Sequence, residues 1–405
     1  MVRLLLLLAL ANLVIGTGAF VISSILEPIA ADLGVSVPLV GQAMTVYALS
    51  TALLAPLALL STGGWPRKRA LQTALGLFAL GNIVCVLAAD LAAFLAGRVA
   101  MGLGAMLTPL AAGIAVASVD GARRGRALSI VFLGISLSYV VGLPLGAWLG
   151  FRFGWRVPIG LIAALSIAMI VVFELVLTDD VHAPRPSFAG AARAVAHAPV
   201  AWTLALTLLY FTAIFVVFSY IGPVLRALRP MGSAELGFTL MLFGLSGVAG
   251  TLIGGFANDR FGSTRTLTVQ LTVLGAMMFI VPLTVGYPVA TIAAFLVWGA
   301  AAFGMMAPQQ SRLATAAPRQ APLLLSLNAS MVYVGTALGA ALGGGFSEVL
   351  GFARLPWVGI PLTALGLATV LIDRAQHQRQ LSVQQSTPDL YRRRAEARRS
   401  AAGSD

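Results

Sequence analysis

The chain has 405 residues, of which 59% are hydrophobic and only 10% are charged, and its net charge is +12. The core of a water-soluble domain cannot absorb so much apolar surface, so lipid must be the solvent. The single cysteine, Cys85, excludes an intramolecular disulfide. No metal-ligand cluster, phosphate-binding glycine loop or nucleophile–base set occurs, so we expect no metal, no cofactor and no enzymatic activity.

Apolar runs long enough to cross a bilayer recur along the chain. A spanning helix needs about 20 such residues, because the hydrocarbon core is ~30 Å thick and a helix rises ~1.5 Å per residue. The runs are continuous, whereas strands of a membrane barrel would alternate apolar and polar residues. We therefore predict an all-α membrane protein whose first run is a retained helix and not a cleaved signal. Its twelve spans are expected near 4–26, 39–62, 70–89, 91–119, 127–149, 157–178, 201–224, 236–257, 266–287, 289–311, 322–349 and 355–372.

The basic residues are distributed unevenly between the two sides of this topology. With both ends on one side, thirteen Lys and Arg outside the tail lie on that side and five on the other. Positive charge collects on the cytoplasmic side, so we predict a multi-pass protein of the inner or plasma membrane with both termini cytoplasmic. Topology explains the high charge better than nucleic acid does, and we expect no nucleic-acid partner.

The chain divides near its middle at a polar, proline-containing stretch that begins at Asp179. Around it, Tyr139–Gly150 resembles Tyr333–Gly343 in the order of aromatic, apolar and glycine residues. Such an internal repeat indicates two pseudo-symmetric six-helix halves. We predict an N-terminal half over 1–178, a cytoplasmic linker over 179–200, a C-terminal half over 201–373, and a basic, disordered cytoplasmic tail over 374–405 that is able to adhere to anionic lipid.

An acid and a base stand together between the eighth and ninth spans, at Asp259 and Arg260, followed by Gly262. A damaged copy lies upstream, where Gly63 and Gly64 occupy the corresponding positions. The pair is either a topogenic charge or a conformational latch. We favour the latch, in which the acid accepts hydrogen bonds from a neighbouring helix end or arginine when the cytoplasmic side is closed.

These motifs, taken in order, resemble the major facilitator superfamily, and within it the twelve-helix drug:proton antiporter and sugar-efflux branch. The resemblance covers the chain to about residue 373 and rests on five matches. They are Gly255-x-x-x-Asp259-Arg260-x-Gly262, Arg98-x-x-x-Gly102-x-Gly104, Arg123-Arg-Gly-Arg-Ala127, Gly142-Leu-Pro144-Leu-Gly146 and Ser326-Leu-Asn328-Ala-Ser330.

The resemblance implies transport by alternating access around a cavity between the first, fourth, seventh and tenth spans, with proton exchange. This chain departs from the family pattern at the residues that would couple transport to protons. Members of this branch often carry acids in the first span, where this chain reads Gly16-Thr-Gly-Ala-Phe20.

Aromatic and hydrogen-bonding side chains on those four spans are the candidate substrate contacts, although packing is the commoner role of each one alone. Arg98 is the one cation well inside a span, so it is either a functional group or a cap for backbone carbonyls. Glu174 is the one acid within a span and is a candidate for proton coupling with Arg98, although interfacial exposure is the commoner explanation. The predicted substrate contacts are Thr17, Phe20, Arg98, Tyr210, Thr212, Phe215, Trp298 and Gln309, with Ser24, Thr108 and Ser219 as further lining residues.

Glycines recur every four residues on the fifth and eleventh spans, at Gly142 and Gly146 and at Gly335 and Gly339. Small residues let helix backbones approach closely in lipid. The resemblance implies that these faces form the moving contact between the halves, whereas static packing is the alternative.

We therefore expect a monomeric secondary active transporter that exports a small organic solute, whether drug-like, sugar or metabolite. Its partners would be this substrate, membrane lipid and, by resemblance only, protons. A facilitator or uptake carrier is the nearest alternative. A non-transporting receptor or scaffold derived from a carrier is another.

Overall fold

A computed structural model describes residues 2–120, 123–177, 198–316 and 321–373. The described residues are helical, and twelve of their helical segments are long and apolar enough to cross a membrane. All twelve predicted spans are confirmed, with ends that differ by a few residues. The spans are Val2–Ser24, Val37–Ala58, Arg67–Leu87, Leu91–Ala117, Arg124–Phe153, Arg156–Val176, Val200–Phe218, Ser233–Phe261, Ser263–Thr284, Pro288–Leu313, Leu324–Leu350 and Phe352–Asp373.

Most of the predicted linker and the whole tail, 374–405, lie outside the described residues. The second half begins with α11 (Ala198–Phe218), which starts before the predicted end of the linker at residue 200. The bilayer explains the large apolar side chains on the outer helix faces. On α13 (Ser233–Phe261), for example, Leu252 is 70% exposed and Phe256 is 63% exposed.

The first and seventh spans break in the same way, which supports the internal repeat. In the first half, α1 (Val2–Phe20) passes through the 3-10 turn η1 (Val21–Ser24) into the short helix α2 (Leu26–Leu33). In the second half, α11 is followed by the short helix α12 (Ile221–Leu228). The two short helices thus lie at equivalent positions.

The fourth and tenth spans also break at matching points. α5 (Leu91–Gly104) gives way to α6 (Leu107–Ala117), and α15 (Pro288–Phe303) gives way to α16 (Met306–Ala316). The fifth span runs through α7 (Arg124–Leu137), the π-helical turn η3 (Ser138–Gly142) and α8 (Leu143–Phe153). Pro144 has no backbone N–H to donate, and the wider turn accommodates the missing hydrogen bond.

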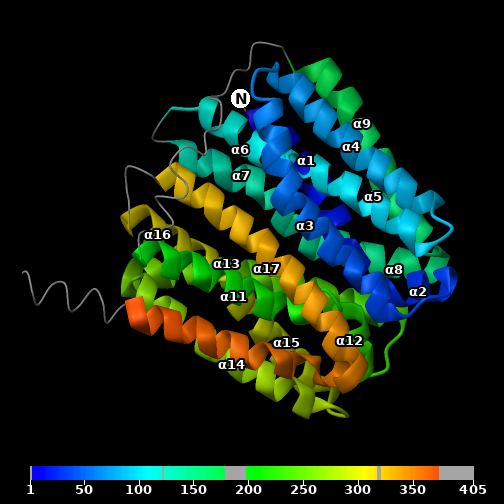
Figure 1. Ribbon diagram of the computed structural model, residues 1–405, viewed down its shortest axis with the longest axis vertical. Coiled ribbons are helices and arrows are strands. Elements are labelled where there is room, and N and C mark those ends of the chain that lie inside the picture. The colour runs from blue at the N-terminus through cyan, green and yellow to red at the C-terminus, as the bar shows by residue number, and fades with distance from the viewer. Residues whose placement is uncertain (1, 121–122, 178–197, 317–320, 374–405) are drawn as a thin grey trace, which may run out of the picture.

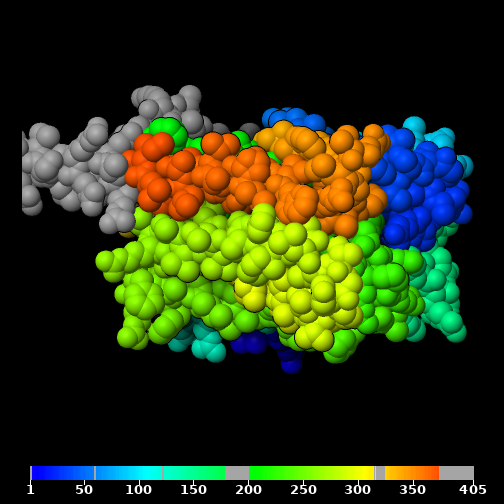
Figure 2. All heavy atoms as spheres, turned by 90° about the horizontal axis from the view of Figure 1, so that it is seen from below, coloured from blue at the N-terminus to red at the C-terminus, as the bar shows by residue number. Residues whose placement is uncertain are grey.

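The two halves lie side by side in Figure 1, the blue-to-cyan half next to the green-to-red half. The flank of the second half is seen in Figure 2, with the orange-red last span above the yellow-green segment and blue first-half residues at one end. Along the junction α3 (Val37–Ser61) packs against α17 (Ala321–Leu350), and α8 packs against α13. The bundle is completed by α4 (Arg67–Leu87), α9 (Arg156–Val176), α14 (Ser263–Ile280) and the last span, Phe352–Asp373, which begins with the 3-10 turn η6 (Phe352–Val358).

We name the two ends of the bundle by their residues. The N-terminal end holds Val2, the turn between α3 and α4, and the turn between α13 and α14. The far end holds α2, α12 and the turn between α8 and α9, and α2, α8 and α12 lie together at the right of Figure 1.

Candidate functional site

An aromatic layer joins the two halves in the middle of the bundle. Phe20 of the first half stacks on Tyr139 at 5.2 Å between ring centroids and lies 6.0 Å from Phe215 of the second half. Tyr139 in turn contacts Phe218 at 5.7 Å and Phe303 at 4.9 Å. Such offset and edge-to-face pairs add to apolar burial. The structure thus brings the predicted residues Phe20 and Phe215 together across the junction.

Trp298 extends this layer into the second half, where it stacks on Phe243 at 5.3 Å, and Phe243 lies 6.1 Å from Phe218. Sequence reasoning missed Tyr139, Phe218 and Phe303 as members of the layer. For Phe218 a signal was available: Phe211, Phe215 and Phe218 follow the i, i+4, i+7 spacing of one helix face.

Several predicted polar contacts are taken up by backbone within their own half. Thr17 donates to the Leu13 carbonyl at 2.7 Å, Thr212 donates to the Leu208 carbonyl at 2.7 Å, and Tyr210 donates to the Ala301 carbonyl. Other groups are buried without a hydrogen-bond partner among the described residues: Trp298 Nε1, Gln309 Oε1 and Ser219 Oγ. Orphaned buried polar atoms are rare and call for water or a ligand.

Gln309 belongs to a polar chain between the seventh, tenth and eleventh spans. It donates to the Thr203 carbonyl and, at 2.8 Å, to Thr207 Oγ1, and Thr207 donates to Asn328 Oδ1 at 2.6 Å. The first half repeats the arrangement, with Thr108 of the fourth span donating to Asn12 of the first span at 2.8 Å. In both halves a polar side chain near the break of the fourth or tenth span therefore ties that span to the first or seventh.

Arg98 is fully buried within the first half and caps the broken end of α1. Its guanidinium donates to the carbonyls of Gly18 at 3.0 Å, Ala19 at 2.9 Å and Ala43 at 3.2 Å. The same group lies over the Tyr47 ring, 4.4 Å from its centroid. The α-helix ends at Phe20, and a helix end leaves carbonyls without an intrahelical partner. In this conformation the hydrogen bonds of the Arg98 guanidinium all go to first-half atoms, which favours the capping alternative. A role of Arg98 in substrate contact or proton coupling stays a prediction.

At the far end the halves approach closely. The Tyr220 ring fits over Gly41 of the first half, and its hydroxyl lies 3.4 Å from the Pro38 carbonyl and donates to the Ala340 carbonyl at 3.0 Å. A Cβ on Gly222 would lie 2.7 Å from the Ser24 carbonyl across the junction, closer than real Cβ atoms approach. A side chain at position 222 would meet the backbone of Ser24 and push the halves apart, whereas one at position 41 would meet the Tyr220 ring.

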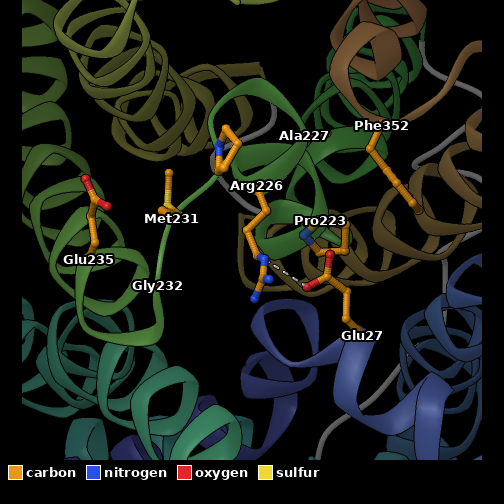
Figure 3. A pocket seen from close by; sticks show the side chains of 9 residues that line it. Glu27, Pro223, Arg226, Ala227, Met231, Gly232, Glu235 and Phe352 are labelled. Atoms are coloured by element: carbon orange, nitrogen blue, oxygen red, sulfur yellow. Dashed lines mark ion pairs between the residues drawn. The ribbon is translucent and has the colours of Figure 1, made fainter. Parts of the chain in front are cut away.

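A cavity of about 610 Å³ opens beside this contact. Glu27 of α2 and Arg226 of α12 both line it and meet directly, with a distance of 3.2 Å between Glu27 Oε2 and Arg226 Nε (Figure 3). Burial raises the pKa of the Glu27 carboxyl, and the charge of Arg226 opposes this rise. Nearby, the hydrogen bond from Arg156 lowers the pKa of Asp32.

The four glycines predicted to form the moving contact lie at close helix–helix contacts within their own halves, on η3, α8 and α17, which also line the junction. Their part in a moving contact stays a prediction. A side chain on Gly142 or Gly146 would meet Thr17 or Val21 of the first span. Those on Gly335 and Gly339 would meet the seventh span, at Leu208 and Thr212. The faces that cross the junction are different ones, carrying Gly41, Gly222, Gly237, Gly244 and Gly344.

The predicted latch lies at the N-terminal end and is not engaged. Asp259 is exposed, and its side chain accepts a hydrogen bond from Asn258 at 3.3 Å. Gly262 has φ +79°, a conformation that favours glycine and ends α13. The latch stays a prediction for a conformation closed at this end.

Glu174 lies on the outside of the first half, where it pairs with Lys68 at 3.0 Å and accepts from Gln72 at 2.8 Å. Its side chain therefore faces away from the junction, and this position matches the interfacial alternative. Within the described ranges no three His, Cys, Asp or Glu side chains come together as metal ligands would.

Two repeated halves of apolar spans, in contact around a central aromatic layer, define a multi-pass membrane transporter. The model of the Major Facilitator Superfamily matches residues 8–321, and the chain belongs to this family.

The relatives include the uncharacterized MFS-type transporter YbcL of Bacillus subtilis (strain 168), 30% identical, with 90% of this chain and 93% of that protein covered. The inner membrane transport protein YdhP of Escherichia coli (strain K12) is 29% identical, with 91% and 95% covered. A probable sugar efflux transporter of Pasteurella multocida (strain Pm70) is 26% identical, with 90% of each chain covered.

Among solved structures, a bacterial homolog of the human lysosomal transporter Spinster, in an inward-facing and unoccupied conformation, has a TM-score of 0.73. It is 18% identical, with 92% of this chain and 95% of that chain covered, and therefore supports the fold alone.

Proposed function

We propose that the chain exports a small organic solute across the inner or plasma membrane by alternating access, with both termini in the cytoplasm. The observation that carries this proposal is the asymmetry of the junction. The halves meet at the far end through Tyr220, Gly41 and the Glu27–Arg226 pair, whereas Asp259 at the N-terminal end is unengaged. This pattern is expected of an alternating-access carrier whose halves are in contact at one end and separated at the other.

Efflux is favoured over uptake because relatives named sugar efflux transporters match nearly the whole chain. The substrate class follows from the junction itself. Aromatic rings offer apolar area, and the orphaned Trp298 Nε1, Ser219 Oγ and Gln309 Oε1 offer one or two hydrogen bonds. A moderately polar, amphipathic solute with hydroxyl or amide groups suits this combination.

A proton is the proposed driving ion, as the resemblance implies. Glu174 is a poor carrier for it, because it pairs with Lys68 on the outer surface of the bundle. The proposal therefore does not depend on this residue, and Glu174→Gln should leave pH-dependent flux in place.

The test is solute flux into and out of proteoliposomes, with and without a pH gradient, for compounds first selected by ligand-induced thermal stabilisation. Flux that a pH gradient drives against the solute gradient supports the proposal. Flux that only equilibrates the solute indicates a facilitator. Stabilisation by a ligand without any flux indicates a receptor.

A further inference from the structure

Five ion pairs occur among the described residues, and only one joins the halves. Lys68–Glu174 and Arg156–Asp32 lie within the first half, and Arg229–Glu235 and Arg312–Asp373 lie within the second. The exception is Glu27–Arg226 at the far end.

We propose that Arg226 is a positioning residue that clamps the far end of the carrier shut, by pairing with Glu27 and stacking on Phe151 of the first half. The inference rests on the proposed alternating access, in which this end must open once in each cycle.

The geometry of Arg226 supports this role because both of its charged contacts cross the junction. Its Nε pairs with Glu27 of α2, and its guanidinium lies over the Phe151 ring of α8, 4.8 Å from the centroid. An arginine can form both contacts together, since its planar group pairs through its edge and stacks through its face. When the far end opens, both contacts break at once.

Losing Arg226 and losing Glu27 should have different effects on the closed state. Burial disfavours the Glu27 carboxylate, and Arg226 compensates for part of this cost. Removal of Arg226 alone leaves a half-buried carboxylate without its partner, which penalises the closed state. When Glu27 is neutralised as well, no unpaired carboxylate remains and the closed state is no longer penalised. Neutralising Glu27 by substitution should therefore restore closure in a variant that lacks Arg226.

Among the residues that the structure describes, Arg226 supplies the one charge that offsets the burial of Glu27. The helix α3, which packs against α2, contains no charged residue. On α2 itself, Asp32 is held by Arg156 and Trp155, and beyond α12 Arg229 pairs with Glu235. The charged groups around this end are Glu27, Asp32, Asp90, Arg152, Arg156, Arg226, Arg229, Glu235, Glu348 and Arg354.

A cysteine introduced at a buried position of the junction can be labelled only when the far end opens. Ser24 is 1% exposed, and its carbonyl lies against Gly222 of the other half. In the full-length protein with Cys85→Ala and Ser24→Cys, the rate of labelling by a water-soluble maleimide measures how often the far end opens. We expect Arg226→Gln to raise this rate about 3- to 10-fold, from the loss of one ion pair and one cation–π contact. Adding Glu27→Gln should return the rate close to that of the parent.

Arg156→Gln is the matched control. Arg156 also pairs with an acid, Asp32, and lies 4.3 Å from the centroid of an aromatic ring, Trp155, but all three residues belong to the first half. It should leave the labelling rate unchanged. The proposal is overturned if Arg226→Gln labels at the parental rate, if the control rises equally, or if Glu27→Gln fails to reverse the change.

If Arg226→Gln does not fold, Arg226→Lys replaces it. Lysine keeps the charge but lacks the planar group that stacks on Phe151, so about a 2- to 3-fold rise is expected and a parental rate refutes the clamp. Labelling needs no transport. A changed rate without solute flux would reject the proposed transport and keep the clamp, whereas flux with unchanged labelling would reject the clamp alone.

Discussion

The substitution Arg98→Met tests the capping of the first span. It keeps an unbranched side chain but removes the donors to the carbonyls of Gly18, Ala19 and Ala43. Three charge-assisted hydrogen bonds are worth about 1.5–3 kcal/mol each. The relief of a charge buried at membrane depth returns about 2.5–3.5 kcal/mol. The net loss of stability should therefore be about 1–6.5 kcal/mol.

Thermal unfolding of the purified protein, followed by gel filtration and tryptophan fluorescence, measures this loss as a fall in Tm of several degrees. Arg98→Lys should fall by less, because an ammonium retains part of the hydrogen bonding. Arg260→Met, at an exposed position, serves as the control. A parental Tm for Arg98→Met together with lost substrate binding would refute the capping role and make Arg98 a ligand group.

Three further outcomes follow from the ends of the bundle. Gly41→Ala should drive the Tyr220 ring away from the junction and raise far-end thiol labelling several-fold, whereas Gly76→Ala, with open space around its Cβ, should not; equal rates would refute the contact. Asp32→Asn should flatten the acid dependence of Tm between pH 7 and pH 3. The pKa of Asp32 is lowered in the fold, so its contribution is present above its ordinary pKa and is lost as the pH falls through the lowered value; an unchanged profile would contradict this. Asp259→Asn should leave the Tm unaltered, since the side chain is exposed, but slow solute flux if the latch forms in the other conformation.

Much of the fold could be predicted because each spanning helix must satisfy its backbone internally, so hydropathy alone locates it. The twelve spans, the absence of strands among the described residues, and the matching halves were all predictable. The breaks at Phe20 and Gly304 were not, because a continuous apolar run conceals where a helix bends.

The site was less predictable, since a residue's span does not fix the direction of its side chain. Phe20, Phe215 and Trp298 do lie in one aromatic layer. Arg98 instead faces the carbonyls of its own half, and Glu174 faces outward. The glycine stripe at Gly142 and Gly146 packs against the first span in this conformation, a neighbour that its spacing alone did not indicate.

The sequence by itself determined that the chain lies in a lipid bilayer, how many times it crosses and to which family it belongs. These properties depend on composition, hydropathy and short motifs. Only the tertiary structure decided which helix faces meet and at which end the halves are closed. Glu27 and Arg226 show the reason. They are 199 positions apart and carry no motif, and only the matching bends after the first and seventh spans bring α2 and α12 together.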